Sequence, residues 1–149
     1  MKVALGADHG GFELKEAIKS HLIENGYEIV DFGTDSTESV DYAVFGEKVG
    51  EYVVKEGCLG ILCCGTGIGI SLAANKVNGV RAACCSDYFS AKMTRAHNNA
   101  NILSMGGRVI GVGLALQLVD VFLTTEFEGG RHQRRIDQIT AIENKQKEL

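Results

Sequence analysis

The sequence contains no proline and no tryptophan among its 149 residues. The lack of proline excludes proline-rich linkers, PxxP ligands and cis-proline turns. Charge of one sign is not in large excess either: 15 Lys and Arg face 19 Asp and Glu, for a formal net charge of −4. This balance argues against a surface for nucleic acid or acidic membranes. The chain also has no apolar run long enough for a signal peptide or a membrane span, so we expect a soluble cytoplasmic protein.

Cysteine is the one reactive residue type that is well represented. The five cysteines are Cys58, Cys63, Cys64, Cys84 and Cys85, an odd number with two adjacent pairs in apolar segments. This pattern is typical of reduced thiols in an intracellular protein. Neighbouring side chains of a strand point to opposite faces, so adjacent cysteines chelate a metal poorly, and we predict no metal site.

The remaining composition predicts one ordinary globular domain. Hydrophobic residues make up 45% and charged residues 23%, and a chain of 149 residues can bury a core without disulfides or a metal. Short apolar segments alternate with amphipathic ones. We expect strands at 2–6, 27–31, 59–64, 80–85 and 102–105, and helices between 11 and 25, at 42–57, from 68 to 77, at 86–96, around 114–122 and from about 131.

This alternation predicts the fold class. Strands that are apolar on both faces and separated by helices are typical of a parallel sheet with helices on both faces. We therefore predict a single doubly wound α/β domain over residues 1–149, Rossmann- or flavodoxin-like, with five parallel strands. Ligands bind such sheets outside the carboxyl ends of the strands. The segments that follow the strands there are 7–11, 64–69, 86–88 and 106–108.

The strongest local signal is the segment Cys64-Gly65-Thr66-Gly67-Ile68-Gly69. Its glycines let the backbone approach a ligand, and a helix that follows directs unpaired N–H groups toward it. These features indicate an anion site, in which Cys64 is expected to be partly ionised to the thiolate. The alternative is a small buried residue at a tight turn, and the segment alone favours neither.

Nucleotide-binding patterns match this segment only in part. Gly65-Thr66-Gly67 begins like a dinucleotide fingerprint, but the third glycine would fall at Ile70 and stands at 69 instead. The phosphate-loop pattern fails because no Gly-Lys-Ser/Thr follows the glycines. A nucleotide-binding module therefore stays an alternative to an enzyme.

Arginines gather near the C-terminus. Three of the six arginines fall within residues 131–135, and Arg131 and Arg135 lie one helical turn apart. Two guanidinium groups in that arrangement suit a phosphate, although a solvated basic patch is the simpler interpretation. Since a single domain offers no second domain to receive them, the site of a dimer partner is a plausible destination.

Six motifs in order resemble the family of type B ribose-5-phosphate isomerases and lactose-pathway galactose-6-phosphate isomerase subunits. They span nearly the whole chain, at 6–11, 64–69, 73–76, 97–101, 107–109 and 129–132. The resemblance implies an aldose–ketose isomerisation through an enediolate, without cofactor or metal. It implies that Cys64 is the base, that Thr66 assists proton transfer at the oxygens, and that His97 opens the sugar ring. Amides of the whole loop from Gly65 to Gly69, those of Gly67 and Ile68 included, would stabilise the enediolate oxyanion.

The resemblance also implies how the substrate is held. Asp8 and Asn98 would bind sugar hydroxyls, with Tyr42 near the sugar. The phosphate would be bound by His9 and Arg108 of one chain with Arg131 and Arg135 of the other, in a homodimer or tetramer whose helix from about 131 reaches the partner.

One segment departs from the family pattern. The family usually has Asp-Tyr-Pro-Asp where this chain has Asp41-Tyr42-Ala43-Val44, and this change can alter which sugar fits. The preferred substrate is therefore open among ribose 5-phosphate, allose 6-phosphate, galactose 6-phosphate and a tetrose phosphate.

Overall fold

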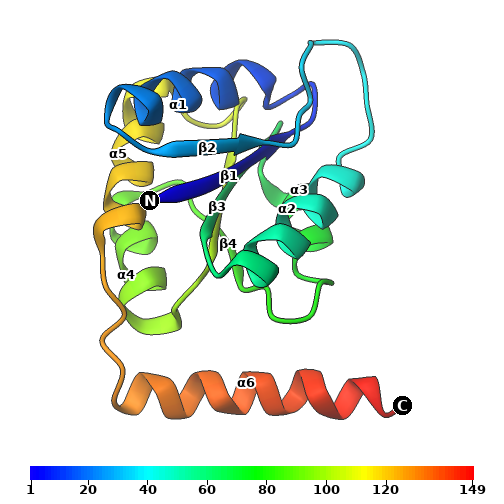
Figure 1. Ribbon diagram of the computed structural model, residues 1–149, viewed down its shortest axis with the longest axis vertical. Helices are drawn as coiled ribbons and strands as arrows, with labels where there is room; N and C mark the ends of the chain where they lie inside the picture. The colour runs from blue at the N-terminus through cyan, green and yellow to red at the C-terminus, as the bar shows by residue number, and fades with distance from the viewer.

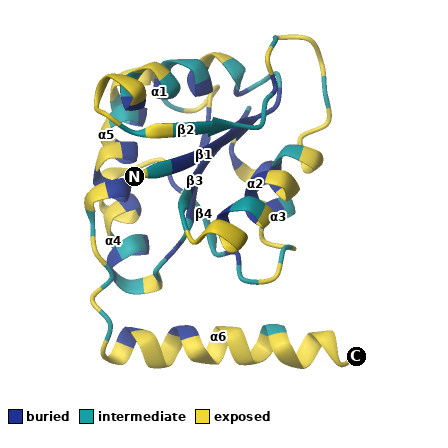
Figure 2. Ribbon diagram, in the orientation of Figure 1, coloured by how far each residue is buried: buried dark blue, intermediate teal, exposed yellow.

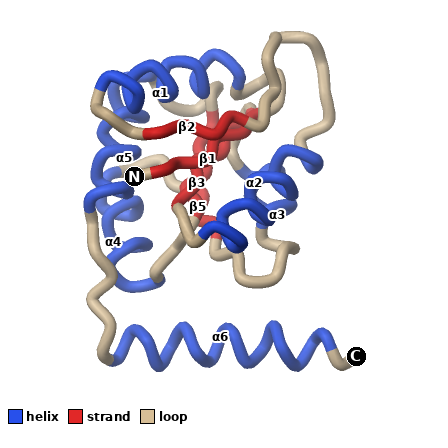
Figure 3. The backbone as a smooth tube through the Cα atoms, in the orientation of Figure 1, coloured by secondary structure: helices blue, strands red, loops and turns tan.

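The computed structural model describes residues 1–149 as five strands and six helices (Figures 1 and 3). The strands are β1 Lys2–Ala7, β2 Glu28–Asp31, β3 Leu59–Cys64, β4 Ala82–Cys84 and β5 Ile102–Gly106. The helices are α1 Phe12–Glu24, α2 Ala43–Glu56, α3 Ile68–Ala74, α4 Tyr88–Asn98, α5 Val112–Thr124 and α6 Arg131–Lys147.

The strands form one sheet in the order β2-β1-β3-β5-β4, and all neighbouring pairs are parallel. The predicted fold class is confirmed. The order differs from the flavodoxin order in its last two strands, since β5 lies between β3 and β4. The chain leaves β1 toward β2 and returns to β3 on the other side, so the switch point lies between β1 and β3.

Helices cover both faces of the sheet. Figure 1 shows α1, α4 and α5 on one face and α2 and α3 on the other. Successive strand residues point to opposite faces, so Leu5 and Leu103 belong to one buried cluster while Ala4 and Ile102 belong to the other. Phe122 of α5 is fully buried in the first cluster. The central strands β1, β3 and β5 therefore carry buried residues on both sides, which explains their nearly unbroken hydrophobic sequences.

Two elements are shorter than the sequence predicts. The expected helix through Val77 ends at Ala74, and the expected strand 80–85 covers only Ala82–Cys84. Asn75 explains the first difference: its Oδ1 accepts the Ala82 N–H at 2.8 Å and its Nδ2 donates to the Ala82 carbonyl at 3.0 Å. Asparagine side chains compete in this way with helical backbone bonds, and here they tie the end of α3 to β4.

A buried lysine joins α1 to the end of β2. Lys15 is 2% exposed, and its Nζ lies 2.7 Å from Asp31 Oδ2 and 3.0 Å from Glu16 Oε2. Asp31 also receives Lys19 at 3.0 Å and the Gly33 N–H at 2.9 Å. Burial opposes ionisation of Asp31, but these hydrogen bonds outweigh it and lower the pKa of its carboxyl group.

Helix α6 stands apart from the rest of the molecule. Figure 2 shows it as almost entirely exposed, with only His132 and Ile136 buried. Ile139 and Ile142 lie 52% and 61% exposed. Glu143 Oε1 accepts the Gly79 N–H at 3.1 Å, which holds the middle of the helix to the turn before β4. No helix in the structure has the length and apolar character that crossing a membrane requires.

Candidate active site at the carboxyl edge of the sheet

The loops that follow β1, β3 and β5 meet at the predicted edge of the sheet. The Gly107 N–H donates to the Cys64 carbonyl at 2.8 Å, and the Arg108 N–H donates to the Gly65 carbonyl at 3.0 Å. The Asp8 N–H donates to the Cys63 carbonyl at 3.3 Å. These bonds fix the three loops against one another at the switch point between β1 and β3.

Cys64 is the last residue of β3 and is 5% exposed. Its Sγ accepts the Gly67 N–H at 3.1 Å. The Gly67 N–H therefore points at the lone pairs of the Cys64 sulfur. Two other cysteines lie in a different environment, because burial raises the pKa of Cys63 and raises the pKa of Cys85 to about 11. Of these three thiols, only Cys64 receives an N–H hydrogen bond.

Gly67 turns the chain from β3 into α3. Its φ of 81° is left-handed, and an added Cβ would lie 2.7 Å from the carbonyl carbon of Met105. The buried Ser104 donates its hydroxyl to the Gly67 carbonyl at 2.5 Å. A side chain at 67 would therefore push the loop off β5, and Ser104, which the sequence analysis did not identify, holds it there.

The same loop presents its amides and one hydroxyl. The Ile68 N–H donates to Thr66 Oγ1 at 3.2 Å, while the N–H groups of Gly65 and Thr66 have no acceptor within the chain. Tyr42, the residue before α2, lies over the loop, since a Cβ on Gly69 would be 2.7 Å from the tyrosine ring. Predicted residues 65–69 and Tyr42 are thus brought together with Cys64.

Asp8 and His9 lie beside this loop in fixed orientations. Asp8 Oδ1 accepts the N–H groups of Gly10 and Gly11 at 2.9 and 3.2 Å, so Asp8 caps its turn as polar residues at such turns commonly do. Its Oδ2 accepts no hydrogen bond from the chain. His9 Nδ1 accepts the Val40 N–H at 3.1 Å, which leaves Nε2 as the N–H donor of the neutral ring.

A cavity of about 310 Å³ lies next to these residues. Its polar lining includes His9, Thr37 and Arg108, together with the carboxylate of Glu13. The Arg108 guanidinium lies over the β3 loop, where a Cβ on Gly65 would be 3.3 Å from its Nη1. The two predicted phosphate ligands of this half, His9 and Arg108, therefore face one small polar cavity. The largest cavity, of about 560 Å³, lies elsewhere, between α6 and residues 75–81.

The other four predicted site residues lie at the opposite edge of the sheet. Helix α4 runs back across the sheet, so His97 and Asn98 at its end precede the first residue of β5. Arg131 and Arg135 begin α6 at the same end (Figure 1). The five residues of β5 separate the two edges by about 13 Å at ~3.3 Å per residue. One chain alone does not bring these four residues to Cys64.

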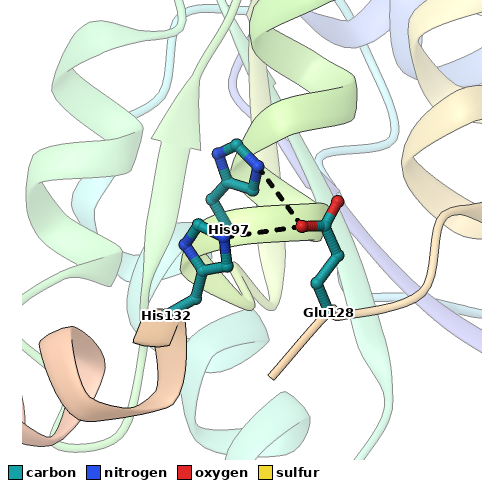
Figure 4. Close-up of side chains that lie close together, drawn as sticks. All are labelled: His97, Glu128 and His132. Atoms are coloured by element: carbon teal, nitrogen blue, oxygen red, sulfur yellow. Dashed lines mark ion pairs between the residues drawn. The ribbon is translucent and has the colours of Figure 1, made fainter. Parts of the chain in front are cut away.

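His97 forms a compact cluster with two residues that the sequence analysis did not assign. The rings of His97 and His132 stack with centroids 4.1 Å apart and planes 8° from parallel. Glu128 Oε1 lies 3.6 Å from His97 Nε2 and 3.4 Å from His132 Nε2 (Figure 4). Burial lowers the pKa of His132, and the nearby positive charges of His97 and Arg131 lower it further.

These three ligand atoms lie within 4.8 Å of one another, which is close enough to consider a metal ion. However, nearly parallel rings direct their Nε2 lone pairs side by side instead of toward one point. The arrangement fits two imidazoles that share one carboxylate better than a metal centre. No sequence signal identifies the pair of Glu128 and His132, because Glu128 precedes α6 and the i, i+4 rule for helical neighbours does not apply to it.

Comparison with known proteins identifies the family. A model of the ribose/galactose isomerase family matches residues 3–139. The chain belongs to this family. It is 50% identical over 145 residues to ribose-5-phosphate isomerase B of Escherichia coli, covering 97% of each chain. The structure of Clostridium thermocellum ribose-5-phosphate isomerase B matches with a TM-score of 0.96 and 54% identity, over 97% of this chain and 99% of that one.

A third relative carries a ligand. The structure of Mycoplasma genitalium ribose-5-phosphate isomerase B, solved with ribulose 5-phosphate bound, matches with a TM-score of 0.92 and 41% identity, covering 96% of each chain. The family resemblance predicted from the six sequence motifs is therefore confirmed along almost the full length of the chain.

Proposed function

We propose that the protein interconverts ribose 5-phosphate and ribulose 5-phosphate through an enediolate, as a cytoplasmic enzyme of the pentose phosphate pathway. The observation that carries this proposal is the setting of Cys64. A thiol buried at the end of β3 receives an N–H hydrogen bond and lies beside a loop with free amides. In a sugar-phosphate isomerase this combination provides a base next to a site for an oxyanion.

The proton transfer follows from this arrangement. The Cys64 thiolate removes the C2 proton of the open-chain aldose, and the electrons of that bond form the C1–C2 double bond while the carbonyl oxygen becomes the enediolate oxyanion. The free N–H groups of Gly65 and Thr66 donate to that oxygen. A donor placed in advance can contribute about 3–4 kcal/mol to the barrier. The thiol then returns the proton to C1, and the Thr66 hydroxyl moves the proton between the two oxygens.

The remaining residues hold the substrate. The free Oδ2 of Asp8 and the amide of Asn98 bind sugar hydroxyls, while Tyr42 forms a wall over the loop. The phosphate binds to the Nε2–H of His9 and to the Arg108 guanidinium, with the opposite side supplied by two more guanidinium groups. Those two groups belong to Arg131 and Arg135. The chemistry requires neither a cofactor nor a metal ion.

We further propose that the active site is shared in a homodimer. His97, Asn98, Arg131 and Arg135 lie at the edge of the sheet opposite Cys64, so they act on the Cys64 site of the partner. The surfaces that would meet carry exposed apolar side chains, as interfaces commonly do. At the carboxyl edge these are Ile68, Leu72, Tyr88 and Phe89, and on α6 they are Ile139 and Ile142. Dimers of this kind can pair further into tetramers.

A second candidate substrate is a phosphorylated sugar of another size, such as allose 6-phosphate, galactose 6-phosphate or a tetrose phosphate. The reason is the start of α2, where Ala43 and Val44 follow Tyr42 and Val44 is 43% exposed. These apolar side chains replace the usual proline and acid beside the wall of the pocket. Membership of an isomerase family leaves a non-enzymatic nucleotide-binding module without support.

The test is the formation of ribulose 5-phosphate from ribose 5-phosphate in the presence of a metal chelator. Cys64→Ala should lower kcat about a hundredfold or more while the protein stays folded, because general-base catalysis contributes ~10²–10⁴-fold. Cys58→Ala, which removes a half-buried thiol next to the start of the same strand, is the matched control and should keep its activity. If well-folded wild-type protein does not turn over ribose 5-phosphate, the assignment fails, and the hexose and tetrose phosphates are assayed next.

A further inference from the structure

Glu128 lies in the connector between α5 and α6 and is held against the end of α4. Its backbone N–H donates to the Ala96 carbonyl at 3.0 Å. This bond places the residue beside His97, which follows Ala96 in the chain. The position is set by the backbone, so a change of the Glu128 side chain leaves the anchor in place.

The carboxylate of Glu128 faces two stacked imidazoles (Figure 4). His132 is buried, His97 is 38% exposed, and Glu128 is 56% exposed. The His132 ring lies flat against the His97 ring and restricts its rotation, while Glu128 attracts the Nε2 edge of both rings. Together they fix the plane of His97 and leave its Nδ1 without a partner in the chain.

The two stacked rings differ in burial and in the charges that surround them. Two imidazolium rings 4.1 Å apart repel each other, and one carboxylate compensates only one positive charge. His132 is buried beside Arg131 and near Arg135, both positive, and these surroundings lower its pKa. His97 is the more exposed ring, and its Nδ1 has no partner in the chain, so it is the ring of the two that a substrate can reach.

We propose that Glu128 is a positioning residue for sugar-ring opening: its carboxylate orients the His97 ring and compensates the positive charge of the imidazolium, while the His132 ring packs against the face of His97. This inference rests on the proposed function. In ring opening the imidazolium gives a proton to the ring oxygen as the C1–O4 bond breaks, and the neutral imidazole then takes the proton of the C1 hydroxyl. The aldehyde forms and the imidazolium is restored.

Two rates separate this role from a structural one. Isomerisation of ribose 5-phosphate, a furanose, needs ring opening. Exchange of the C1 proton of ribulose 5-phosphate with D₂O needs only enediolate formation, because the hydroxyl that would close a ring in this ketose carries the phosphate. Glu128→Gln should lower the first rate tenfold or more, which is part of the ~10²–10⁴-fold supplied by general acid–base catalysis, and leave the second within about twofold of wild type.

The controls use the same connector. Glu126→Gln makes the same charge change at an exposed acid two residues earlier and should alter neither rate. Glu128→Asp keeps the charge and should recover part of the isomerisation. An equal loss of both rates in Glu128→Gln, or no loss of isomerisation, overturns the proposal. Cys64→Ala should lose both rates, and retained exchange in that variant would instead refute the proposed function itself.

Discussion

Two inactive variants of this protein should restore activity to each other when they share a dimer. Cys64→Ala removes the proposed base at the carboxyl edge of the sheet, and Arg131→Ala removes a proposed phosphate ligand at the opposite edge. The edges are about 13 Å apart along β5, a distance that no arginine side chain spans across the body of the same domain. Each substitution therefore damages a different half of the proposed shared site.

The expected recovery follows from counting sites. Equal amounts of the two chains, unfolded and refolded together, give about half hybrid dimers. In a hybrid, one site receives both lesions and the other receives neither. A purified hybrid should thus have about half the wild-type activity, and the unseparated mixture about a quarter.

The assay uses two affinity tags and tandem purification, followed by ribose 5-phosphate turnover. A hybrid of Cys64→Ala with Asp8→Ala is the control, because both residues lie at the carboxyl edge and every site then carries one lesion. Sharing of sites is refuted if the purified Cys64/Arg131 hybrid is as inactive as its parents. Recovery in the Cys64/Asp8 hybrid would equally contradict the division of the site.

Two further predictions concern stability and substrate binding. Asp31→Asn leaves the buried Lys15 with the half-exposed Glu16 as its only ion-pair partner. It should lower the free energy of unfolding, measured with urea at pH 7, by about 2–4 kcal/mol, whereas Lys19→Ala should lower it by less than ~1 kcal/mol. Because folding lowers the pKa of Asp31, this stabilisation is present above pH ~4 and is lost as the pH falls. The free energies of unfolding of wild type and Asp31→Asn should therefore become equal in acid, and a difference that stays constant with pH would contradict the ion pair. Gly69→Ala should push the Tyr42 ring outward and raise KM for ribose 5-phosphate several-fold with little change in Tm, and an unchanged KM would show that Tyr42 does not contact the sugar.

Much of the fold could be predicted because the sheet is covered on both faces. Strands such as Leu59–Cys64 are apolar throughout, and glycines at 57 and 65 mark their ends. The end of α3 was not predictable from periodicity, since Val77 continues the apolar pattern. Helix α3 stops at Ala74 because the Asn75 side chain pairs with β4, a contact between residues that only the folded sheet brings together.

The residues of the candidate site could be named from the sequence, but their arrangement in space could not. The loop from Cys64 to Gly69 was identified because ligands collect at the carboxyl ends of parallel strands. His97 was placed by resemblance, without its position in the sheet. That position does follow from the topology, because a helix that leads into β5 must end at the amino edge. Glu128 has no motif of its own, and its role depends on a backbone bond to Ala96 that sequence patterns do not show.

Because α6 is so exposed, we expect the folding of this helix to depend on the protein concentration. A helix of 17 residues with two buried side chains gains little from its own domain, because most of the stability of a helix in a protein comes from the packing of its apolar face. Under the shared-site proposal, contacts with the partner supply the missing stabilisation. Amide protons of α6 should then exchange faster as the protein is diluted, while those of β3 keep their protection. The same association equilibrium would set both the number of complete active sites and the fraction of chains whose last helix is folded.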